Sequence, residues 1–180
     1  IGRAIAIECS KMGARLVLSA RNNSRLDETL SMLEGNNHLK IVADLSDYSQ
    51  IENLVQTLPK LDGCVNNAGI VKPIVFRLTE KEDIDNLMKV NTFSPIYLSQ
   101  LLVKNKQLNK DASVVFMSSI AGVYSTSIGG IMYGTSKSAI NGFVKGLALE
   151  LSVRGIRVNT INPAMIDTNI FGDSAISSEQ

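Results

Sequence analysis

Short apolar runs alternate with helix-like segments along the chain, and this alternation limits the folds that the chain can adopt. Five runs have the length and composition of buried strands, and they occupy residues 16–18, 41–43, 63–65, 114–117 and 156–161. Strands that are separated by helices and short connections pair as a parallel sheet with helices on both of its faces. The sequence therefore predicts an α/β fold, a doubly wound parallel sheet in a single domain over residues 1–180.

The intervals between these runs carry the helical patterns. The sequence predicts helices over residues 1–12, 24–33, 46–58, 80–107 and 131–151. Asn23 or Ser24 is predicted to cap the second helix, and Ser46 the third. Pro95 must bend or break the fourth helix, and it leaves the carbonyl of Asn91, one turn earlier, without its usual donor.

Composition narrows the class of protein. The chain has 180 residues, 44% of them apolar, and a formal net charge of +1, so neither a nucleic acid nor a membrane is a favoured partner. The only histidine, His38, lies in a polar run and is expected to be a solvated loop residue. With a single histidine, the sequence argues against a Ser-His-Asp hydrolase and against a histidine-rich metal site. The chain begins at Ile1 inside a helical pattern and ends in a polar tail, so we expect a fragment at both ends.

Polar or otherwise distinctive residues follow the predicted strands where each strand ends. Ligands of open parallel sheets bind outside the carboxyl ends of the strands. The residues that fall at these five ends are Arg21, Asp44, Asn67, Ser119 and Pro163. Five strand ends with suitable chemistry make a binding site at this edge a stronger hypothesis than any one motif could.

Tyr133 and Lys137 are four residues apart, so a helix places them one turn apart on one face. A lysine cation beside a tyrosine stabilises the phenolate, and a serine hydroxyl from the end of the preceding strand can hold a carbonyl or alcohol oxygen. This trio suits proton transfer to an oxygen while a hydride moves to its carbon. Alone, Tyr-x-x-x-Lys also occurs on ordinary surface helices.

Taken together, these pieces resemble the classical short-chain dehydrogenase/reductases over essentially the whole chain, including members that reduce 3-oxoacyl-acyl-carrier-protein thioesters. The segments that match, in order, are Asn66-Asn67-Ala68-Gly69, Asn91, Ser118-Ser119, Tyr133-x-x-x-Lys137, and Asn162-Pro163 with Thr168. The resemblance implies a Rossmann-like sheet whose first strand, and whose last strand with much of the substrate lid, are missing from this sequence. It also implies a reductase or alcohol dehydrogenase that uses a nicotinamide dinucleotide.

The resemblance assigns roles to four catalytic residues. Tyr133 would be the general acid/base, and Ser119 would orient the substrate oxygen. Lys137 would support Tyr133 and bind the nicotinamide ribose, and Asn91 would hold a water that links Lys137 to solvent. Ser119 is preferred to Ser118 because it lies three residues before Gly122, as in the family pattern; Ser118 is expected to satisfy backbone groups at the strand end.

The resemblance also implies a cofactor-binding set. Gly2 would be the last glycine of the phosphate-binding turn, at a helix N-terminus. Arg21 follows Ala20 where NAD-preferring relatives carry a carboxylate, and a guanidinium suits the 2′-phosphate of NADP, which we favour over NAD. The complete predicted set is Ile1, Gly2, Arg21, Asp44, Leu45, Asn67, Ala68, Gly69, Tyr133, Lys137, Pro163, Ile166 and Thr168.

Two other functions remain open at this point. One is a dinucleotide-binding scaffold or regulatory protein without catalysis, which the intact tetrad disfavours. The other is an epimerase or dehydratase of the extended relatives, which also use Tyr-x-x-x-Lys. By resemblance we expect a small-molecule carbonyl or alcohol substrate and a homo-oligomer, a dimer or tetramer. Cys9 and Cys64 show no metal spacing and are expected to be reduced, so cytoplasmic location is the default expectation.

Overall fold

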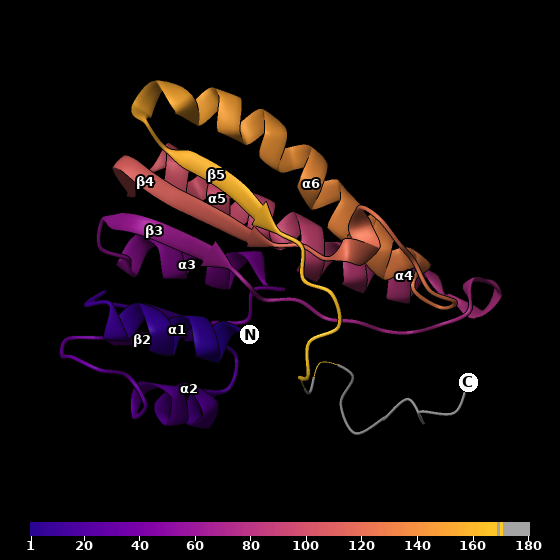
Figure 1. The fold of residues 1–180 in the computed structure, drawn as a ribbon, viewed down its shortest axis with the longest axis horizontal. Coiled ribbons are helices and arrows are strands. Elements are labelled where there is room, and N and C mark those ends of the chain that lie inside the picture. Colours follow the sequence, from indigo (N-terminus) through magenta and orange to yellow (C-terminus); the bar gives the residue numbers. More distant parts are fainter. Residues whose placement is uncertain (169, 171–180) are drawn as a thin grey trace.

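The computed structural model describes residues 1–168 and 170 (Figure 1). The α-helices of this part of the chain are α1 (Gly2–Lys11), α2 (Asn23–Leu30), α3 (Tyr48–Thr57), α4 (Lys81–Met88), α5 (Ser94–Lys104) and α6 (Ile131–Leu151). The strands are β1 (Val17–Ala20), β2 (Leu39–Val42), β3 (Leu61–Asn66), β4 (Leu108–Met117) and β5 (Arg157–Ile161). All five predicted strands and all five predicted helical regions are present, with shifted ends.

Every strand pair is parallel, as the alternation predicts. The strands form two hydrogen-bonded sets, β1–β2 and β3–β4–β5. Strand β4 is central in the larger set, where Val115 is paired with Val65 on one side and Asn159 on the other. Because β3, β4 and β5 run in one direction, their carboxyl ends reach the same edge of the sheet.

One hydrophobic core holds the larger set against its helices. Phe116, on β4, is 1% exposed and meets the ring of Phe143 from α6 nearly edge-on, with ring centroids 5.8 Å apart. Buried aliphatic side chains surround this contact, and they come from α3 (Ile51, Val55), α5 (Leu102), α6 (Ile140, Val144) and β5 (Val158). The packed core thus fixes the last residues of β4, immediately before the predicted catalytic serines.

Two helix starts differ from the prediction. The side chain of Asn22 accepts the N–H of Arg25 at 2.9 Å, so Asn22, and neither Asn23 nor Ser24, caps α2. Asp47 caps α3 by accepting the N–H of Ser49 at 2.9 Å. Ser46 does not cap this helix. Several cap-type residues follow one another here, and only the last extended residue before the helix can reach its free N–H groups.

The predicted long helix is broken as Pro95 requires, but by a distinct element. Helix α4 ends at Met88, a π-helical turn spans Lys89–Phe93, and α5 begins at Ser94 with Pro95 in its first turn. Asn91 lies inside the π-helical turn and is 2% exposed. Such turns occur often at functional sites.

His38 lies in a loop, as predicted, but it is half-buried and bonded on both ring nitrogens, so the prediction that it is solvated was wrong. Its Nδ1 accepts the N–H of Leu16 at 3.1 Å, and its Nε2 lies 2.8 Å from the carbonyl oxygen of Glu34. The ring therefore joins the turn before β1 to the end of the α2 region. Both partners are backbone groups, which the local sequence around His38 does not reveal.

No helix among residues 1–168 is long and apolar enough to cross a membrane. Within the same residues, His, Cys, Asp and Glu do not gather in a group of three that could hold a metal ion.

Candidate active site

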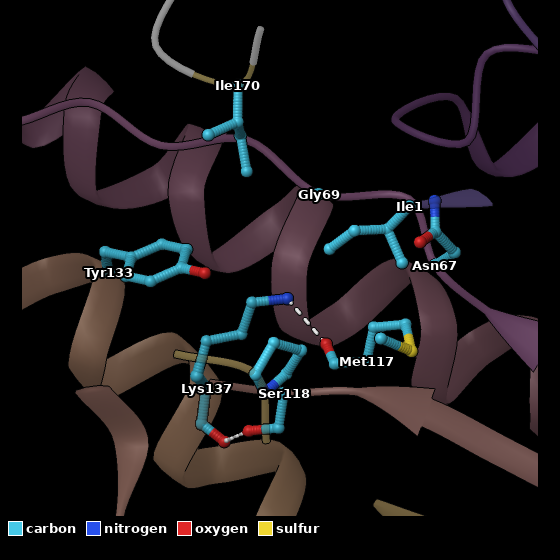
Figure 2. Close-up of a pocket in the computed structure, with 9 residues that line it drawn as sticks. Ile1, Asn67, Gly69, Met117, Ser118, Tyr133, Lys137 and Ile170 are labelled. Atoms are coloured by element: carbon cyan, nitrogen blue, oxygen red, sulfur yellow. Dashed lines mark hydrogen bonds between the residues drawn. The ribbon is translucent and has the colours of Figure 1, made fainter. Parts of the chain in front are cut away.

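A small cavity of about 60 Å³ lies at the carboxyl ends of β3, β4 and β5 (Figure 2). The residues that line it are Ile1, Asn67, Gly69, Met117, Ser118, Tyr133, Lys137, Pro163 and Ile170. Six of these belong to the predicted site, and they come from four different parts of the chain. Of the five strand-end residues, Asn67 and Pro163 line this cavity, whereas Arg21, Asp44 and Ser119 do not.

Tyr133 and Lys137 lie in the first turns of α6 and face this cavity together. Figure 2 shows the Tyr133 hydroxyl directed toward the ammonium end of Lys137. The Lys137 Nζ is 5.8 Å from the centre of the Tyr133 ring. A cation at this position is able to stabilise negative charge on the phenol oxygen.

The ammonium of Lys137 is buried at the bottom of the site. Lys137 is only 5% exposed, and its Nζ donates to the carbonyl oxygen of Met117 at 2.8 Å. Burial lowers the pKa of Lys137 from 10.5 to about 8, because removal from water penalises the charged form. Among the described residues this lysine has one neutral acceptor and no carboxylate partner, which is costly for stability and points to a functional role.

Gly69 brings a bare stretch of backbone close to this ammonium. A Cβ added at Gly69 would lie 3.3 Å from the Lys137 Nζ and 3.3 Å from the Asn91 Oδ1. These contacts are tighter than most contacts that real Cβ atoms make. The Asn91 side chain and the Lys137 ammonium therefore converge on one backbone position.

The side-chain amide of Asn91 uses both of its N–H groups and one oxygen lone pair in joining three segments. Its Oδ1 accepts the N–H of Ile70 at 2.8 Å, and its Nδ2 donates to the carbonyl of Ile70 at 2.9 Å and to the Oγ of Ser136 at 3.1 Å. Asn91 thus fixes the loop after β3 against α6. Its backbone carbonyl lacks the usual donor four residues on, because that residue is Pro95.

The two serines after β4 have different surroundings. The Ser118 hydroxyl donates to the carbonyl oxygen of Lys137 at 3.0 Å and accepts from the Asn141 Nδ2 at 2.9 Å, so it is engaged within the protein. The Ser119 Oγ accepts the N–H of Ala121 at 3.2 Å, and its own hydrogen is left to donate to a ligand. Ser118 lines the cavity and Ser119 does not, but this hydrogen bonding favours Ser119 as the residue that holds a substrate oxygen.

Comparison with known proteins decides the family. The family model described as "short chain dehydrogenase" matches residues 1–177. This chain belongs to the short-chain dehydrogenase family.

The relatives and solved structures agree with this assignment. A 3-oxoacyl-[acyl-carrier-protein] reductase FabG of Rickettsia bellii is 32% identical over 170 residues, which are 94% of this chain and 70% of the relative. A tropinone reductase homolog of Arabidopsis thaliana is 36% identical over 189 residues, with 98% and 69% covered. The structure of a short chain dehydrogenase from Burkholderia cenocepacia in complex with NADP superimposes with a TM-score of 0.88 at 30% identity, covering 94% of this chain and 71% of that one.

Two features of this short-chain dehydrogenase fit a nicotinamide dinucleotide. In the described part of the chain, the Nδ2 of Asn66, the last residue of β3, and the Oδ1 of Asn162, just after β5, are buried without a partner, so polar groups remain to be satisfied at this edge. A Cβ added at Gly2 would lie 2.6 Å from the Asn67 Nδ2, so a larger residue here would force the Asn67 side chain to move, whereas glycine lets the N-terminus of α1 lie close to the end of β3. The free N–H groups of a helix N-terminus are suited to a pyrophosphate.

Arg21 and Asp44 lie together at the ends of β1 and β2. The Arg21 Nη1 is 4.0 Å from the Asp44 Oδ2, and the Arg21 side chain is largely exposed. The N–H of Ser46 donates to Asp44 at 2.8 Å and is the main cause of its lowered carboxyl pKa, with a smaller contribution from Arg21. Leu45, next to this carboxylate, packs against the core. The Arg21 guanidinium is thus held loosely and is accessible to a ligand.

The remaining predicted residues lie at varying distances from the cavity. The carbonyl of Pro163 accepts the N–H of Ile120 at 3.1 Å, which joins the segment after β5 to the turn after β4. Ala68 is exposed, and neither Ile166 nor Thr168 lines the cavity among the described residues.

The sequence did not reveal the parts played by three residues. Met117 supplies the acceptor for Lys137, and Ser136 and Asn141 hold the Asn91 and Ser118 side chains. Of these, only Asn141 gave a usable signal, since it lies one turn after Lys137 on the same helix face.

Proposed function

We propose that this short-chain dehydrogenase reduces a ketone to a secondary alcohol with NADPH, or catalyses the reverse oxidation. The observation that carries the proposal is the cavity in which the Tyr133 hydroxyl points toward the buried ammonium of Lys137 (Figure 2). The dinucleotide, when bound, supplies or accepts the hydride. The protein supplies the proton, the orientation and the charge.

The proton steps follow from the hydrogen bonds already described. Ser119 donates its hydroxyl hydrogen to the substrate oxygen, because its Oγ lone pair already accepts from Ala121. Tyr133 then gives its proton to the same oxygen as the carbon is reduced. The Lys137 cation stabilises the resulting phenolate. In alcohol oxidation the same groups act in reverse, and Tyr133 removes the hydroxyl proton.

Tyr133 must regain a proton from solvent after each reduction. Both N–H groups of the Asn91 amide are engaged by Ile70 and Ser136, and its Oδ1 already accepts from Ile70, so we assign water binding to the Asn91 backbone carbonyl oxygen, which lacks its usual donor. That oxygen lies in the π-helical turn that precedes Pro95. A water there would link Lys137 to bulk solvent.

Preference for NADP rests on Arg21. Its only described charged partner is Asp44, at 4.0 Å and with both side chains exposed to solvent, so the pair is weak. A 2′-phosphate carries more charge than one carboxylate and offers a forked guanidinium several acceptors.

The substrate is proposed to be apolar around its carbonyl group. Two loops meet beside the entrance to α6, where the N–H of Ile74 donates to the carbonyl of Gly129 at 3.1 Å. Both loops expose large apolar side chains: Phe76 is 58% exposed, Tyr124 83% and Ile128 93%. A 3-oxoacyl thioester is one substrate of this kind, and the relative from Rickettsia bellii carries that activity in its name.

We propose that α6 also forms a contact between two copies of this chain. Gly142 and Gly146 are exposed, and nothing lies within 4 Å of a Cβ added at either. They therefore do not pack against the sheet, and Leu149 continues the same face at 77% exposure. A flat face of small residues that ends in an exposed leucine allows two helices to approach closely.

The proposed function is tested by steady-state reduction of a ketone panel that includes 3-oxoacyl thioesters, with the complete gene product. We expect NADPH consumption, and we expect Tyr133→Phe to lower kcat at least a thousandfold while its NADPH affinity stays within about threefold of the parent. Full activity in the variant would contradict the role of Tyr133.

The same assays separate the two alternative functions. Dinucleotide binding without turnover of any compound would favour a scaffold. Product formation without net NADPH consumption would favour an epimerase or dehydratase.

A further inference from the structure

Ser118, immediately after β4, is tied to α6 by two hydrogen bonds, with Lys137 and with Asn141, and a third bond joins Asn141 to Lys137 within α6. The Asn141 Nδ2 donates to the Ser118 Oγ at 2.9 Å and to the Lys137 carbonyl oxygen at 3.1 Å. The Ser118 hydroxyl donates to the same carbonyl at 3.0 Å. We call these three residues the Asn141 network.

The directions of these bonds show that Asn141 orients the Ser118 hydroxyl. Its N–H occupies a lone pair of the Ser118 oxygen, so the Ser118 hydrogen is directed to the Lys137 carbonyl. Ser118 is 5% exposed, so bulk water is a poor substitute for the amide. Without the amide, the buried hydroxyl loses its only described donor and is free to rotate.

Both ends of the Asn141 network continue into groups that the mechanism uses. Ser118 is covalently followed by Ser119, whose hydroxyl holds the substrate oxygen. On the other side, Lys137 extends its ammonium to the carbonyl of Met117, the residue before Ser118 (Figure 2). The end of β4 is therefore attached to Lys137 twice. The Met117 carbonyl accepts from the Lys137 ammonium, and the Ser118 hydroxyl donates to the Lys137 backbone carbonyl.

We propose that Asn141 is a positioning residue for the reductase reaction. It fixes the end of β4 against α6, and so sets the separation between the Ser119 hydroxyl and the Tyr133–Lys137 pair. Asn141 touches neither substrate nor cofactor in this assignment, and acts through Ser118. The inference rests on the proposed function, because its kinetic consequence requires a carbonyl reaction at this site.

The direct test compares Asn141→Asp with the parent enzyme. The replacement keeps the shape of the side chain but removes the N–H donor, and it sets a carboxylate oxygen against the Lys137 carbonyl. Asn53→Asp is the matched control, since Asn53 is an exposed residue of α3 far from the Asn141 network in the sequence. Turnover is expressed per bound NADPH, so that unfolded protein does not count.

We expect Asn141→Asp to lower kcat at least tenfold, with NADPH affinity within about twofold of the parent. Asn53→Asp should match the parent in both. A readout that does not depend on turnover is amide hydrogen exchange at residues 117–119, which should become faster in Asn141→Asp without a similar change in the β3 region. A lower melting temperature with an unchanged kcat per bound NADPH would make Asn141 merely structural and would overturn the inference.

Ser118→Ala provides a second variant that does not place a charge in the protein. If Asn141 acts through Ser118, the double variant Ser118→Ala with Asn141→Ala should lose little more activity than the worse single variant. Losses that multiply would overturn the proposed route. A parent enzyme that reduces no carbonyl would refute the proposed function. The hydrogen-exchange experiment would still show whether Asn141 fixes the end of β4.

Discussion

Replacing Lys137 with methionine should stabilise the protein at neutral pH while abolishing turnover. Methionine has a similar length and fills the same space without a charge. Lys137 is 5% exposed, and burial lowers its pKa from 10.5 to about 8. At about 1.4 kcal/mol for each pKa unit, this difference corresponds to about 3 kcal/mol of stability lost while the ammonium is charged.

The direction in which stability changes with pH depends on how many protons the folded and unfolded chains bind. Below pH 8 both folded and unfolded chains hold the proton, so the full penalty is present. Between about pH 8 and 10.5 only the unfolded chain holds it, so the stability of the parent rises with pH through this window. Methionine does not titrate, and its variant lacks this rise.

The methionine variant also loses the hydrogen bond to the carbonyl of Met117, which costs about 1 kcal/mol at any pH. We therefore expect Lys137→Met to be about 2 kcal/mol more stable than the parent at pH 7 and about 1 kcal/mol less stable near pH 10.5. Urea unfolding of both proteins at constant ionic strength measures this difference, and other titrating groups cancel because both proteins share them. A difference that stays constant from pH 7 to 10.5 would refute the reasoning.

Three further predictions concern other parts of the molecule. Arg21→Ala should weaken NADPH binding at least tenfold and NADH binding less than threefold; equal losses in a side-by-side fluorescence titration would remove the 2′-phosphate role. Gly122→Ala should destabilise the protein by about 1–3 kcal/mol in urea unfolding and lower kcat, because its Cβ would lie 2.8 Å from the backbone carbon of Lys137. Asp47→Ala should cost about 1 kcal/mol through loss of the α3 cap, with kcat unchanged; an unchanged unfolding midpoint would contradict the cap.

Much of the fold and part of the site follow from local sequence rules. Apolar runs and helical stripes predict the parallel layers, since each depends on residues only a few positions apart. The pairing of Tyr133 with Lys137 is equally local, because four residues make one helical turn. The shared edge of Asn67, Ser119 and Pro163 follows from the parallel direction of the strands that precede them.

The details that failed depend on contacts between distant segments. His38 is held by backbone groups of Leu16 and Glu34, and nothing in its own neighbourhood reveals them. The burial of Asn91 and the partners of Asn141 likewise arise only when α6 packs against β4 and the loop after β3. Such contacts decide which polar residues become positioning groups, and a single sequence does not display them.

Close backbone contact also holds the turn after Ser119 against α6. A Cβ at Gly122 would lie 2.8 Å from Lys137 and Ser138 backbone atoms, and one at Gly134 would lie 2.8 Å from the carbonyl oxygen of Ala121. The turn after Ser119 is thus pressed directly onto the helix that carries Tyr133, with no side chain between them. Because backbone atoms deform less easily than side chains repack, this contact limits how far the turn after Ser119 can move relative to α6. The Asn141 network, one turn further along α6, would then fix the position of Ser118, and with it the position of Ser119, at the end of β4.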